Sequence, residues 1–449
     1  MSLDELALAA QIPGSTSASV QLVGDRRVSW FRFDVDEPAA PLTQEMTHVM
    51  QRAAQVALDE RIPLVLVISS TGSDIVQGIA SLDGWGRVAR ILARCSGRVP
   101  TFAVLDGPAV SGPALLLGLV DFVVATTRGY AFVNGPVMVR QFTGIAISKN
   151  DLGSAAALAQ HAGLPIAVVD DRRSAVVVVE EVLAYLPDHV DLEPPIWACL
   201  DPVDRPCPEA GELVPESSTG SYDVREVAEA IVDEDSFYEV RARWAGNVVT
   251  AFATVGGRPV GIVANQPMNL AGTLDIPASQ KAARFVSFCD AFNLPIVTLV
   301  DTPGFYPGKD LEWRGMIRHG AQLVYAYGRA TVPRICVILR KSYGGAYIVM
   351  DSKTMGNDVC LAWPWAELAV MGAGQAAAIL QRRATEDERA AFETDYADRL
   401  LNPYTAAERG YVDAVIDPAE TRREVAAALQ MLADKRESLP RRKHGNTPL

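Results

Sequence analysis

Two adjacent glycines follow a strand pattern in the segment RKSYGGAYIVM, residues 340–350. The apolar run just before it, residues 335–339, is typical of a buried strand, and glycine lets the backbone approach a ligand where a Cβ atom would clash. If Gly345 and Ala346 begin a helix, their N–H groups have no partner inside that helix and lie at the positive end of its dipole. Such amides can stabilise an oxygen that gains negative charge, as in an oxyanion hole. A tight turn without a ligand is the alternative for these residues alone.

A second strand-to-helix turn is expected in the first half of the chain. The run from Thr101 to Leu105 predicts a strand, and it leads into GPAVSGP at residues 107–113. Pro113 fits the first position of a helix, because the N–H that proline lacks is not needed there. The sequence therefore predicts two glycine turns of the same kind.

The elements that must position these turns alternate between helix and strand. A helical stripe that includes Met46, Val49 and Met50 precedes the strand pattern LVLVI at residues 64–68, which indicates an α/β fold. The pattern RIPLV at 61–65 recurs in kind as NLPIV at 293–297. Further landmarks keep nearly the same offset: Pro100 and Pro333, Gly112 and Gly345, Asp121 and Asp358, Gly135 and Gly372. We interpret this repetition as a duplicated domain.

A proline-rich stretch separates the two halves. Seven prolines crowd residues 186–221 without sustained periodicity, and a helix restarts at Asp223 with the capping-box spacing to Glu226. We therefore expect a first domain at residues 1–190, a linker at 191–222 and a second domain at 223–449.

Composition excludes several classes of protein. A formal net charge of −13 argues against nucleic-acid binding. The six cysteines form no C-x-x-C pair, so we expect free thiols in a reducing compartment and no metal site. The N-terminal MSLDELALAA lacks a signal-peptide pattern, and the longest apolar stretch, 104–125, is interrupted by Asp106, prolines and Asp121. These observations predict a cytoplasmic protein without a membrane segment.

Longer motifs fill most of residues 240–449. They include VANQP from Val263, LVDTPGFYPG from Leu299, IRHGAQLVYAY from Ile317, NPYTAAERGYVDAVIDP from Asn402 and the terminal RKHGNTPL. With the glycine turn, they closely resemble the carboxyltransferase β-subunit of biotin-dependent acyl-CoA carboxylases, of the propionyl-CoA and acetyl-CoA carboxylase type. The resemblance implies an α/β fold of two duplicated crotonase-like ββα-spiral domains, with each active site formed between subunits.

The resemblance also implies a chemistry performed largely by backbone amides. A carboxyl group moves from carboxybiotin, carried on a separate protein, to the α-carbon of a short acyl-CoA, and no metal takes part in this subunit. Gly345 and Ala346 are expected to face the biotin ureido oxygen, while Ser111 and Gly112 face the acyl-CoA carbonyl. Further contacts are implied for biotin at Gly344, Tyr347, Ile348, Gly304 and Phe305, and for acyl-CoA at Thr71, Gly72, Val110 and Gly135.

The first half departs from the family pattern. Residues 69–74 read SSTGSD where the family has a sequence close to DSGGAR, and the A-G-G-A turn appears as Val110-Ser111-Gly112-Pro113. A first hole built on Ser111 and Gly112 survives, and we favour that arrangement. A hole built on Gly112 and Pro113 has lost a donor, because proline has no N–H.

Nucleotide hydrolysis and serine hydrolysis are poorly supported by the motifs. The D-x-x-G of residues 301–304 occurs without a phosphate-binding loop, and the nucleophile elbow of a serine hydrolase would need glycine at Ala109. Two alternatives to a working carboxyltransferase stay open: an enzyme that decarboxylates a malonyl-type thioester or uses an unusual acceptor, and a structural subunit of a carboxylase complex. The implied partners are a biotin carboxylase, a biotin carboxyl carrier subunit and further copies of the chain, a dimer at least and a hexamer by family resemblance.

Overall fold

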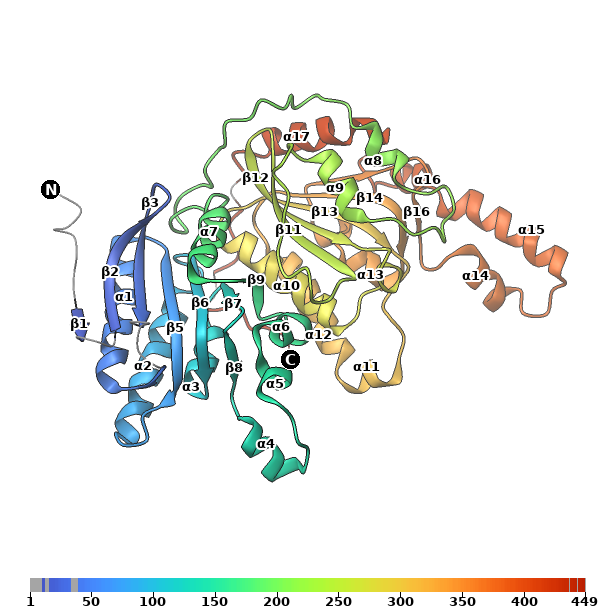
Figure 1. The fold of residues 1–449 in the computed structure, drawn as a ribbon. Helices are drawn as coiled ribbons and strands as arrows, with labels where there is room; N and C mark the ends of the chain where they lie inside the picture. The colour runs from blue at the N-terminus through green and yellow to red at the C-terminus, as the bar shows by residue number, and fades with distance from the viewer. Residues whose placement is uncertain (1–9, 13–15, 34–38, 436, 442, 449) are drawn as a thin grey trace. The chain divides into compact units, whose positions relative to one another are not determined.

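The structure is a computed structural model, and it describes residues 10–12, 16–33, 39–435, 437–441 and 443–448. Residues 1–9, which include most of the N-terminal stretch tested for a signal peptide, lie outside the described residues, as do positions 442 and 449 of the terminal motif. The chain divides into two compact units, Met1–Glu193 and Pro194–Leu449 (Figure 1). Residues 194–222, most of the expected linker, thus group with the second unit.

The first unit is built on one sheet, whose described strands run in the order β1-β2-β3-β5-β6-β7-β9, with β4 beside β5 and β8 beside β6. The β1–β2 and β2–β3 pairs are antiparallel, and the pairs from β3 onward are parallel. The strands are β1 (Ala10–Ile12), β2 (Thr16–Val23), β3 (Arg26–Phe33), β4 (Ala40–Leu42), β5 (Leu64–Ser73), β6 (Thr101–Val110), β7 (Phe122–Thr126), β8 (Tyr130–Phe132) and β9 (Pro165–Val169). The helices are α1 (Gln44–Glu60), α2 (Ile79–Cys95), α3 (Gly112–Leu117), α4 (Pro136–Thr143), α5 (Lys149–Gly153), α6 (Ala155–Ala157) and α7 (Arg172–Leu183).

The second unit repeats this plan with a sheet in the order β10-β11-β12-β13-β14-β15-β17 and with β16 beside β14. Its strands are β10 (Tyr238–Glu239), β11 (Val248–Val255), β12 (Arg258–Asn265), β13 (Ile296–Thr302), β14 (Arg334–Tyr343), β15 (Val359–Ala362), β16 (Glu367–Ala369) and β17 (Ala414–Val415). Its helices are α8 (Pro208–Glu212), α9 (Val224–Ile231), α10 (Ile276–Ala291), α11 (Lys309–Trp313), α12 (Met316–Arg329), α13 (Gly344–Val349), α14 (Ala373–Leu380), α15 (Glu386–Tyr396), α16 (Pro403–Glu408) and α17 (Thr421–Met431).

The duplication extends to single hydrogen bonds at the ends of the strands. At the end of β5, the Gly72 N–H donates to Ser70 Oγ over 3.4 Å, and at the end of β13 the Gly304 N–H donates to Thr302 Oγ1 over 3.4 Å. Both glycines have a positive φ, 119° and 145°, which glycine adopts without a Cβ clash. The same local backbone therefore ends the corresponding strand in each unit.

The beginnings of the next strands also match. The N–H of Thr101 donates to Asp121 Oδ2 over 3.0 Å, and the N–H of Arg334 donates to Asp358 Oδ2 over 2.8 Å. In return, the N–H of each aspartate donates to the carbonyl of its partner over 3.0 Å. These repeats confirm the predicted α/β fold of two duplicated domains.

Sequence patterning explains why these elements form. Thr43 caps α1 by accepting a hydrogen bond from the Met46 N–H, and the predicted stripe of that helix is buried. Every residue of β13 is buried, as expected for a parallel strand covered on both faces. The segment 194–222 is attached by apolar side chains in the core, such as Val214 and Tyr222, and by Arg340, which donates to the carbonyls of Ser217 and Gly220, both over 2.8 Å.

A buried arginine joins three segments of the second unit. Arg422 is fully buried at the start of α17 and donates to the carbonyls of Pro202 and Ile231 and to Asp233 Oδ1, over 3.0, 3.1 and 2.6 Å. Burial tends to raise the pKa of Asp233, but the Gly257 N–H and the other donors, Arg422 among them, hold that pKa below its usual range. The guanidinium thus ties the segment before α8 to α9 and α17.

Removing this guanidinium should destabilise the second unit strongly. We expect Arg422→Ala to lower the free energy of unfolding by about 3–5 kcal/mol, because Asp233 is left as a buried charge with one fewer donor. Arg423→Ala is the matched control, because the Arg423 side chain follows Arg422 in the chain but is half exposed and forms only surface ion pairs. It should leave the free energy of unfolding close to that of the wild type in the same chemical denaturation experiment. Equal losses for the two variants would contradict this assignment.

Candidate active site

The glycine turn of the second unit joins β14 directly to α13. Gly344 has φ 60°, and a Cβ atom there would lie 3.1 Å from the carbonyl oxygen of Val370, so this position requires glycine. The N–H groups of Gly345 and Ala346 belong to the first turn of α13 and have no backbone acceptor in the described part of the chain. Gly345 is exposed, whereas the Ala346 side chain is buried. The turn thus presents two free donors at the end of a buried strand.

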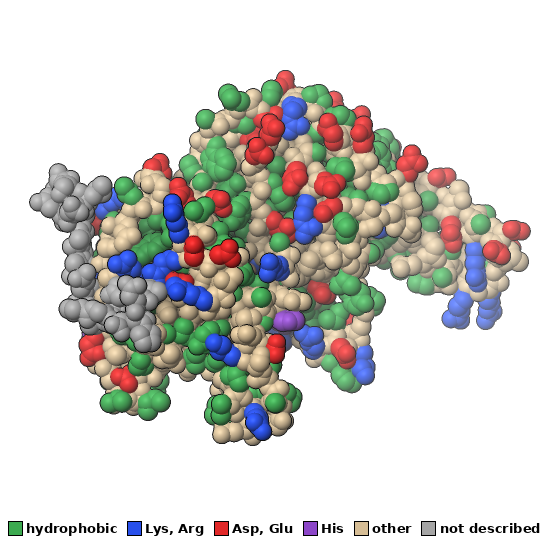
Figure 2. Space-filling view, in the orientation of Figure 1, with side chains coloured by type: hydrophobic (Ala, Val, Ile, Leu, Met, Phe, Trp, Pro, Cys, Tyr) green, Lys and Arg blue, Asp and Glu red, His purple; other side chains and the backbone are tan. Residues whose placement is uncertain are grey.

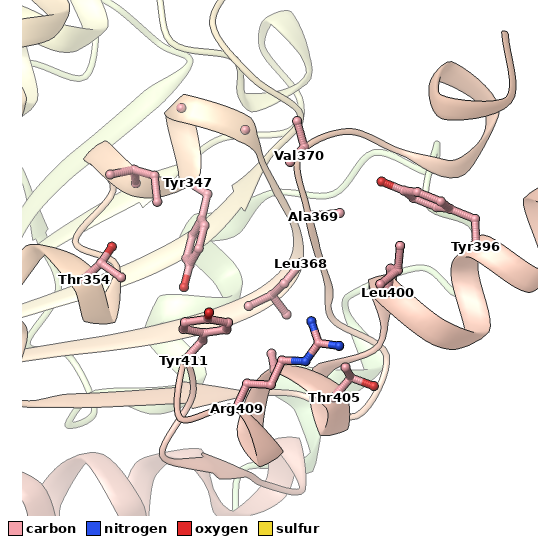
Figure 3. A pocket seen from close by; sticks show the side chains of 14 residues that line it. Tyr347, Thr354, Leu368, Ala369, Val370, Tyr396, Leu400, Thr405, Arg409 and Tyr411 are labelled. Carbon is pink, nitrogen blue, oxygen red and sulfur yellow. The ribbon is translucent and has the colours of Figure 1, made fainter. Parts of the chain in front are cut away.

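A pocket of about 610 Å³ opens beside this turn. Its walls come from α13, from β16 and the residue after it, and from the C-terminal helices of the unit, as Figure 3 shows. Its lining residues are Gly344, Gly345, Tyr347, Ile348, Thr354, Leu368, Ala369, Val370, Tyr396, Leu400, Thr405, Ala406, Arg409 and Tyr411. Arg409 carries the one formal charge among these described lining residues.

The residues assigned to biotin by family resemblance gather around this pocket. Gly344, Tyr347 and Ile348 line it. Phe305 lies next to the turn, because its ring is 3.7 Å from the position that a Cβ atom of Gly345 would take. Gly304 precedes Phe305 at the end of β13 and holds the positive φ described above.

The glycine turn of the first unit has the same backbone with different donors. Ser111 has φ 62° and ψ −120°, close to the φ of Gly344, and α3 begins at Gly112. The pairing of Val110 with Phe132 in β8 corresponds to the pairing of Tyr343 with Ala369 in β16. Ser111, Gly112 and Pro113 therefore correspond to Gly344, Gly345 and Ala346.

This correspondence changes the expected donor pair of the first turn. The Ser111 N–H donates to the carbonyl of Phe132 over 3.0 Å, so this amide is already engaged in the sheet. Pro113 has no N–H. The Gly112 N–H is left as the donor of this turn, and the position that corresponds to Ala346 has lost its donor. The arrangement on Ser111 and Gly112 that the sequence favoured is therefore not supported by the hydrogen bonding.

The residues assigned to acyl-CoA lie at the same edge of the first sheet. A Cβ atom on Gly72 would lie 3.5 Å from the carbonyl oxygen of Val110, which places the end of β5 against the end of β6. Thr71 is exposed beside Gly72. Gly135 directly precedes α4, and its Cβ position is 3.2 Å from the ring of Phe132, the residue whose carbonyl accepts from Ser111. The fold thus brings Thr71, Gly72, Val110 and Gly135 to the neighbourhood of the Gly112 turn.

A buried ion pair supports the far end of α13. Asp351 follows this helix with φ 58°, and its carboxylate is fully buried and accepts from Arg334 Nη1 over 2.6 Å. Arg334 also donates to the carbonyls of Met355 and Gly356. Burial raises the pKa of Asp351 to about 7 and outweighs the ion pair with Arg334. Sequence analysis did not identify this pair, because Arg334 and Asp351 are separated in the chain and neither belongs to a recognisable motif.

Arg409, Tyr396 and Tyr411 were also missed as lining residues. Arg409 and Tyr411 stand in the motif NPYTAAERGYVDAVIDP, which supported the family resemblance without any role for either residue. Tyr396 lies at the end of an exposed, strongly charged helix where nothing in the sequence indicates a pocket. These three side chains line one pocket only because α15 and α16 pack near β16 in the folded chain.

Across the described ranges, no three His, Cys, Asp or Glu side chains are grouped so that they could hold a metal ion. No helix among the described residues has both the length and the apolar character needed to cross a lipid bilayer.

Comparisons with known proteins agree with the geometry. Residues 31–447 match the family model described as the carboxyl transferase domain. The chain is 44% identical over 446 residues to the propionyl-CoA carboxylase beta chain of Saccharopolyspora erythraea, covering 95% of this chain and 82% of that protein. It is 39% identical to the methylmalonyl-CoA decarboxylase subunit alpha of Veillonella parvula, covering 89% and 78%. Among solved structures, the hexameric transcarboxylase 12S with hydrolysed methylmalonyl-CoA bound matches with a TM-score of 0.94 and 40% identity, covering 97% of this chain and 85% of that one.

The raised pKa of Asp351 predicts a characteristic pH dependence of stability. Because the folded-state pKa lies above the ordinary value of about 4, the folded state binds this proton more tightly, and the contribution of Asp351 is fully present below about pH 4 and lost as the pH rises through about 7. Relative to Asp351→Asn, the wild-type protein should therefore lose free energy of unfolding between pH 5 and pH 8, measured by chemical denaturation. Asp310→Asn, at an exposed position, should follow the wild type across this range. A difference between wild type and Asp351→Asn that does not vary with pH would exclude this titration.

Proposed function

The chain belongs to the carboxyl transferase domain family, and on this premise we propose that its two glycine turns are the two oxyanion holes of an enzyme that carries a carboxyl group from carboxybiotin to the α-carbon of a short acyl-CoA. Transfer of a carboxyl group between biotin and an acyl-CoA follows from the family. The residue roles are our proposal. The observation that carries them is the pair of free amides at Gly345 and Ala346, which open beside a pocket of about 610 Å³.

The pocket fits a neutral bicyclic ring with one strongly polar oxygen. Its wall is built largely from apolar and hydroxyl-bearing side chains, and Gly345, the first of the two residues with free amides, lines it next to Ala346. We assign these amides to the ureido oxygen, on which negative charge develops as the carboxyl group departs. When bound, carboxybiotin supplies the carboxyl group. The amides of Gly345 and Ala346 stabilise the developing charge, and the apolar wall excludes water from it.

The first turn is assigned to the thioester carbonyl of the acyl-CoA. The Gly112 N–H donates to this oxygen when the α-carbon becomes an enolate, and Thr71, Gly72, Val110 and Gly135 shape the surrounding edge. Because the first turn keeps one donor where the second keeps two, it stabilises its oxyanion less. Ile348 gives the pocket beside the second turn an apolar side chain, in keeping with the assignment of this pocket to the biotin ring.

The family relationship and the exposed surface both support assembly of several copies. The transcarboxylase 12S core is a hexamer by its title. In the first unit, large apolar side chains are exposed just before α2, at its first residue and on α4: Ile75, Val76, Ile79, Val137 and Phe142. Figure 2 shows hydrophobic side chains gathered over these elements. The second unit exposes Trp313, Ile317 and Val370. We propose that other copies of the chain cover these faces, in a dimer at least and in a hexamer as the full assembly.

The remaining partners are inferred from the chemistry of the reaction and not from an exposed surface. A carboxyl donor must be charged and delivered, so we propose a biotin carboxylase and a biotin carboxyl carrier subunit as partners. We further propose a cytoplasmic location, supported by the six cysteines, which are all free thiols.

A second candidate function is decarboxylation of a malonyl-type thioester. It is favoured by the likeness to the methylmalonyl-CoA decarboxylase subunit and by the missing donor at Pro113. A non-catalytic structural subunit is the third possibility. An assay of a carboxylated biotin carrier against a panel of acyl-CoAs, run in both directions, separates the three: net carboxylation, net decarboxylation, or neither.

The donor role of the second turn can be tested by introducing proline at the position where the first turn already has it. Ala346→Pro removes one donor at the position where the first turn carries Pro113, so the local backbone is known to accept proline. We expect kcat for carboxyl transfer to fall by roughly 10² to 10³, with the affinity for acyl-CoA within a few fold of wild type. Gly345→Ala is the control: it keeps its N–H, and its Cβ atom would meet only the Phe305 ring at 3.7 Å. If Ala346→Pro kept the carboxyl-transfer activity of the control Gly345→Ala, the turn would have a structural role only.

The reciprocal substitution tests the first turn. Pro113→Ala restores an N–H at the position that corresponds to Ala346, so we expect kcat for carboxyl transfer to rise towards the roughly 10² that one donor can contribute. The measurement is steady-state transfer to the preferred acyl-CoA, with Pro113→Gly as a second variant that also carries the N–H. Changes below about threefold in both variants would show that the first hole takes its second donor from another element.

A further inference from the structure

We propose that the guanidinium of Arg409 binds the carboxylate that is transferred, both on the donor and on the carboxylated product. This inference rests on the proposed function, because it concerns the same pocket, and it assigns a role that the two oxyanion holes leave open. The holes receive the ureido and thioester oxygens. Neither of them accounts for the carboxylate itself, which enters and leaves the reaction with a full negative charge.

The first observation is the charge of the pocket. The five polar side chains other than Arg409 are neutral hydroxyls: Tyr347, Thr354, Tyr396, Thr405 and Tyr411. Arg409 is therefore the one charged side chain among the described residues of the lining. In a chain with a formal net charge of −13, an anionic group needs such a local cation.

The second observation is that Arg409 is not compensated. Several arginines of this unit pair with acidic groups, among them Arg225 with Glu239, Arg399 with Asp395 and Arg422 with Asp233. For Arg409, the described residues provide no carboxylate within ion-pair distance and no side-chain hydrogen bond. The guanidinium is therefore available to an external anion.

The third observation is the direction of the side chain. Arg409 ends α16, and its backbone N–H closes that helix by donating to the carbonyl of Ala407. A cation at this position is favourable for the helix dipole, which is the structural explanation for an arginine here. The side chain nevertheless extends from the helix end into the space between Leu368 and Thr405, towards Leu400 (Figure 3). It faces the pocket rather than the carbonyls of its own helix.

The chemistry of the reaction makes the role specific. A guanidinium matches a carboxylate with two parallel N–H donors. Arg409 is exposed at the pocket, so an incoming carboxylate can reach it. The transferred group is a carboxylate in the donor and in the product, but it is neutral as CO2 between them. Arg409 therefore stabilises the two end states and not the neutral species, so its loss should weaken binding without lowering kcat. Arg409 makes and breaks no covalent bond.

The test compares two ligands that differ by one carboxylate. Binding of methylmalonyl-CoA and of propionyl-CoA to the assembled protein is measured by titration calorimetry for wild type, Arg409→Ala and Arg409→Lys. We expect Arg409→Ala to weaken methylmalonyl-CoA roughly tenfold to a hundredfold, while propionyl-CoA stays within about threefold. Arg409→Lys should recover part of the loss, because it keeps the charge without the planar fork. In transfer assays with a carboxylated carrier, KM for the carrier should rise while kcat does not fall.

A matched control and three contrary outcomes complete the experiment. Arg383→Ala removes an exposed arginine of the same unit that does not line this pocket, and it should leave both affinities unchanged. Equal weakening of both ligands by Arg409→Ala, with unchanged thermal unfolding, would show that the residue only shapes the pocket and would overturn the inference. If the wild-type protein transfers carboxyl groups and Arg409→Ala still distinguishes methylmalonyl-CoA from propionyl-CoA as the wild type does, the inference about Arg409 is overturned and the proposed function stands. A wild type that binds neither ligand and transfers nothing would overturn the proposed function with it.

Discussion

The site depends on backbone N–H groups that the fold keeps without a partner. In each unit a long buried strand ends in a residue with positive φ, Ser111 or Gly344, and a short helix begins at once. This change of direction turns the first helical amides out of the sheet, so that neither the strand ladder nor the helix can use them. The surrounding sheet, its covering helices and the buried bonds at the strand ends hold that geometry in place. A hole made of amides needs no side chain of special acidity, which is consistent with the absence of an acid–base pair in the sequence motifs.

The same constraint explains how the two units have diverged. The second turn keeps Gly-Gly-Ala, so its left-handed position is occupied by glycine without strain and both following amides are present. The first turn has Ser-Gly-Pro: Ser111 takes a φ that is unfavourable for a residue with a Cβ atom, and Pro113 removes one amide. Both changes lie within the three residues of the turn, while the strand before it and the helix after it are kept. Divergence has therefore acted on donor number and not on architecture.

The buried charges of the second unit and the one charge of its pocket lining differ in whether they are paired. Most buried charges of the second unit are structural: Asp301 accepts from Arg340, Asp233 from Arg422 and Asp351 from Arg334, each within 3.0 Å. These pairs anchor the segment 194–222, α17 and the end of α13, and each leaves the pocket lining free of charge. Arg409 is the exception, since it reaches the lining without an acidic partner among the described residues. The contrast between compensated charges in the core and an uncompensated one in the pocket separates groups that hold the fold from a group that can hold a substrate.

The amino-acid sequence by itself determined the fold class, the duplication and the two turns, because these depend on local patterns. Buried strands, Gly-Gly and the recurring spacing near 232 residues are visible without any tertiary contact, and the motifs of residues 240–449 indicated the family that the comparisons confirmed. The positions of Gly345 and Ala346 in the first turn of a helix also followed from this pattern.

Tertiary structure alone decided which amides are free and which side chains meet. Whether Ser111 can donate depends on Phe132, which reaches it only because β8 pairs with the end of β6. The grouping of Tyr396, Arg409 and Tyr411 with the turn depends on how α15 and α16 fold back, and the partners of Arg334 and Arg422 lie on distant segments. A sequence pattern reports the conformation that a segment prefers. It does not report which distant carbonyl or carboxylate satisfies a given donor, because that is set by the packing of elements far apart in the chain.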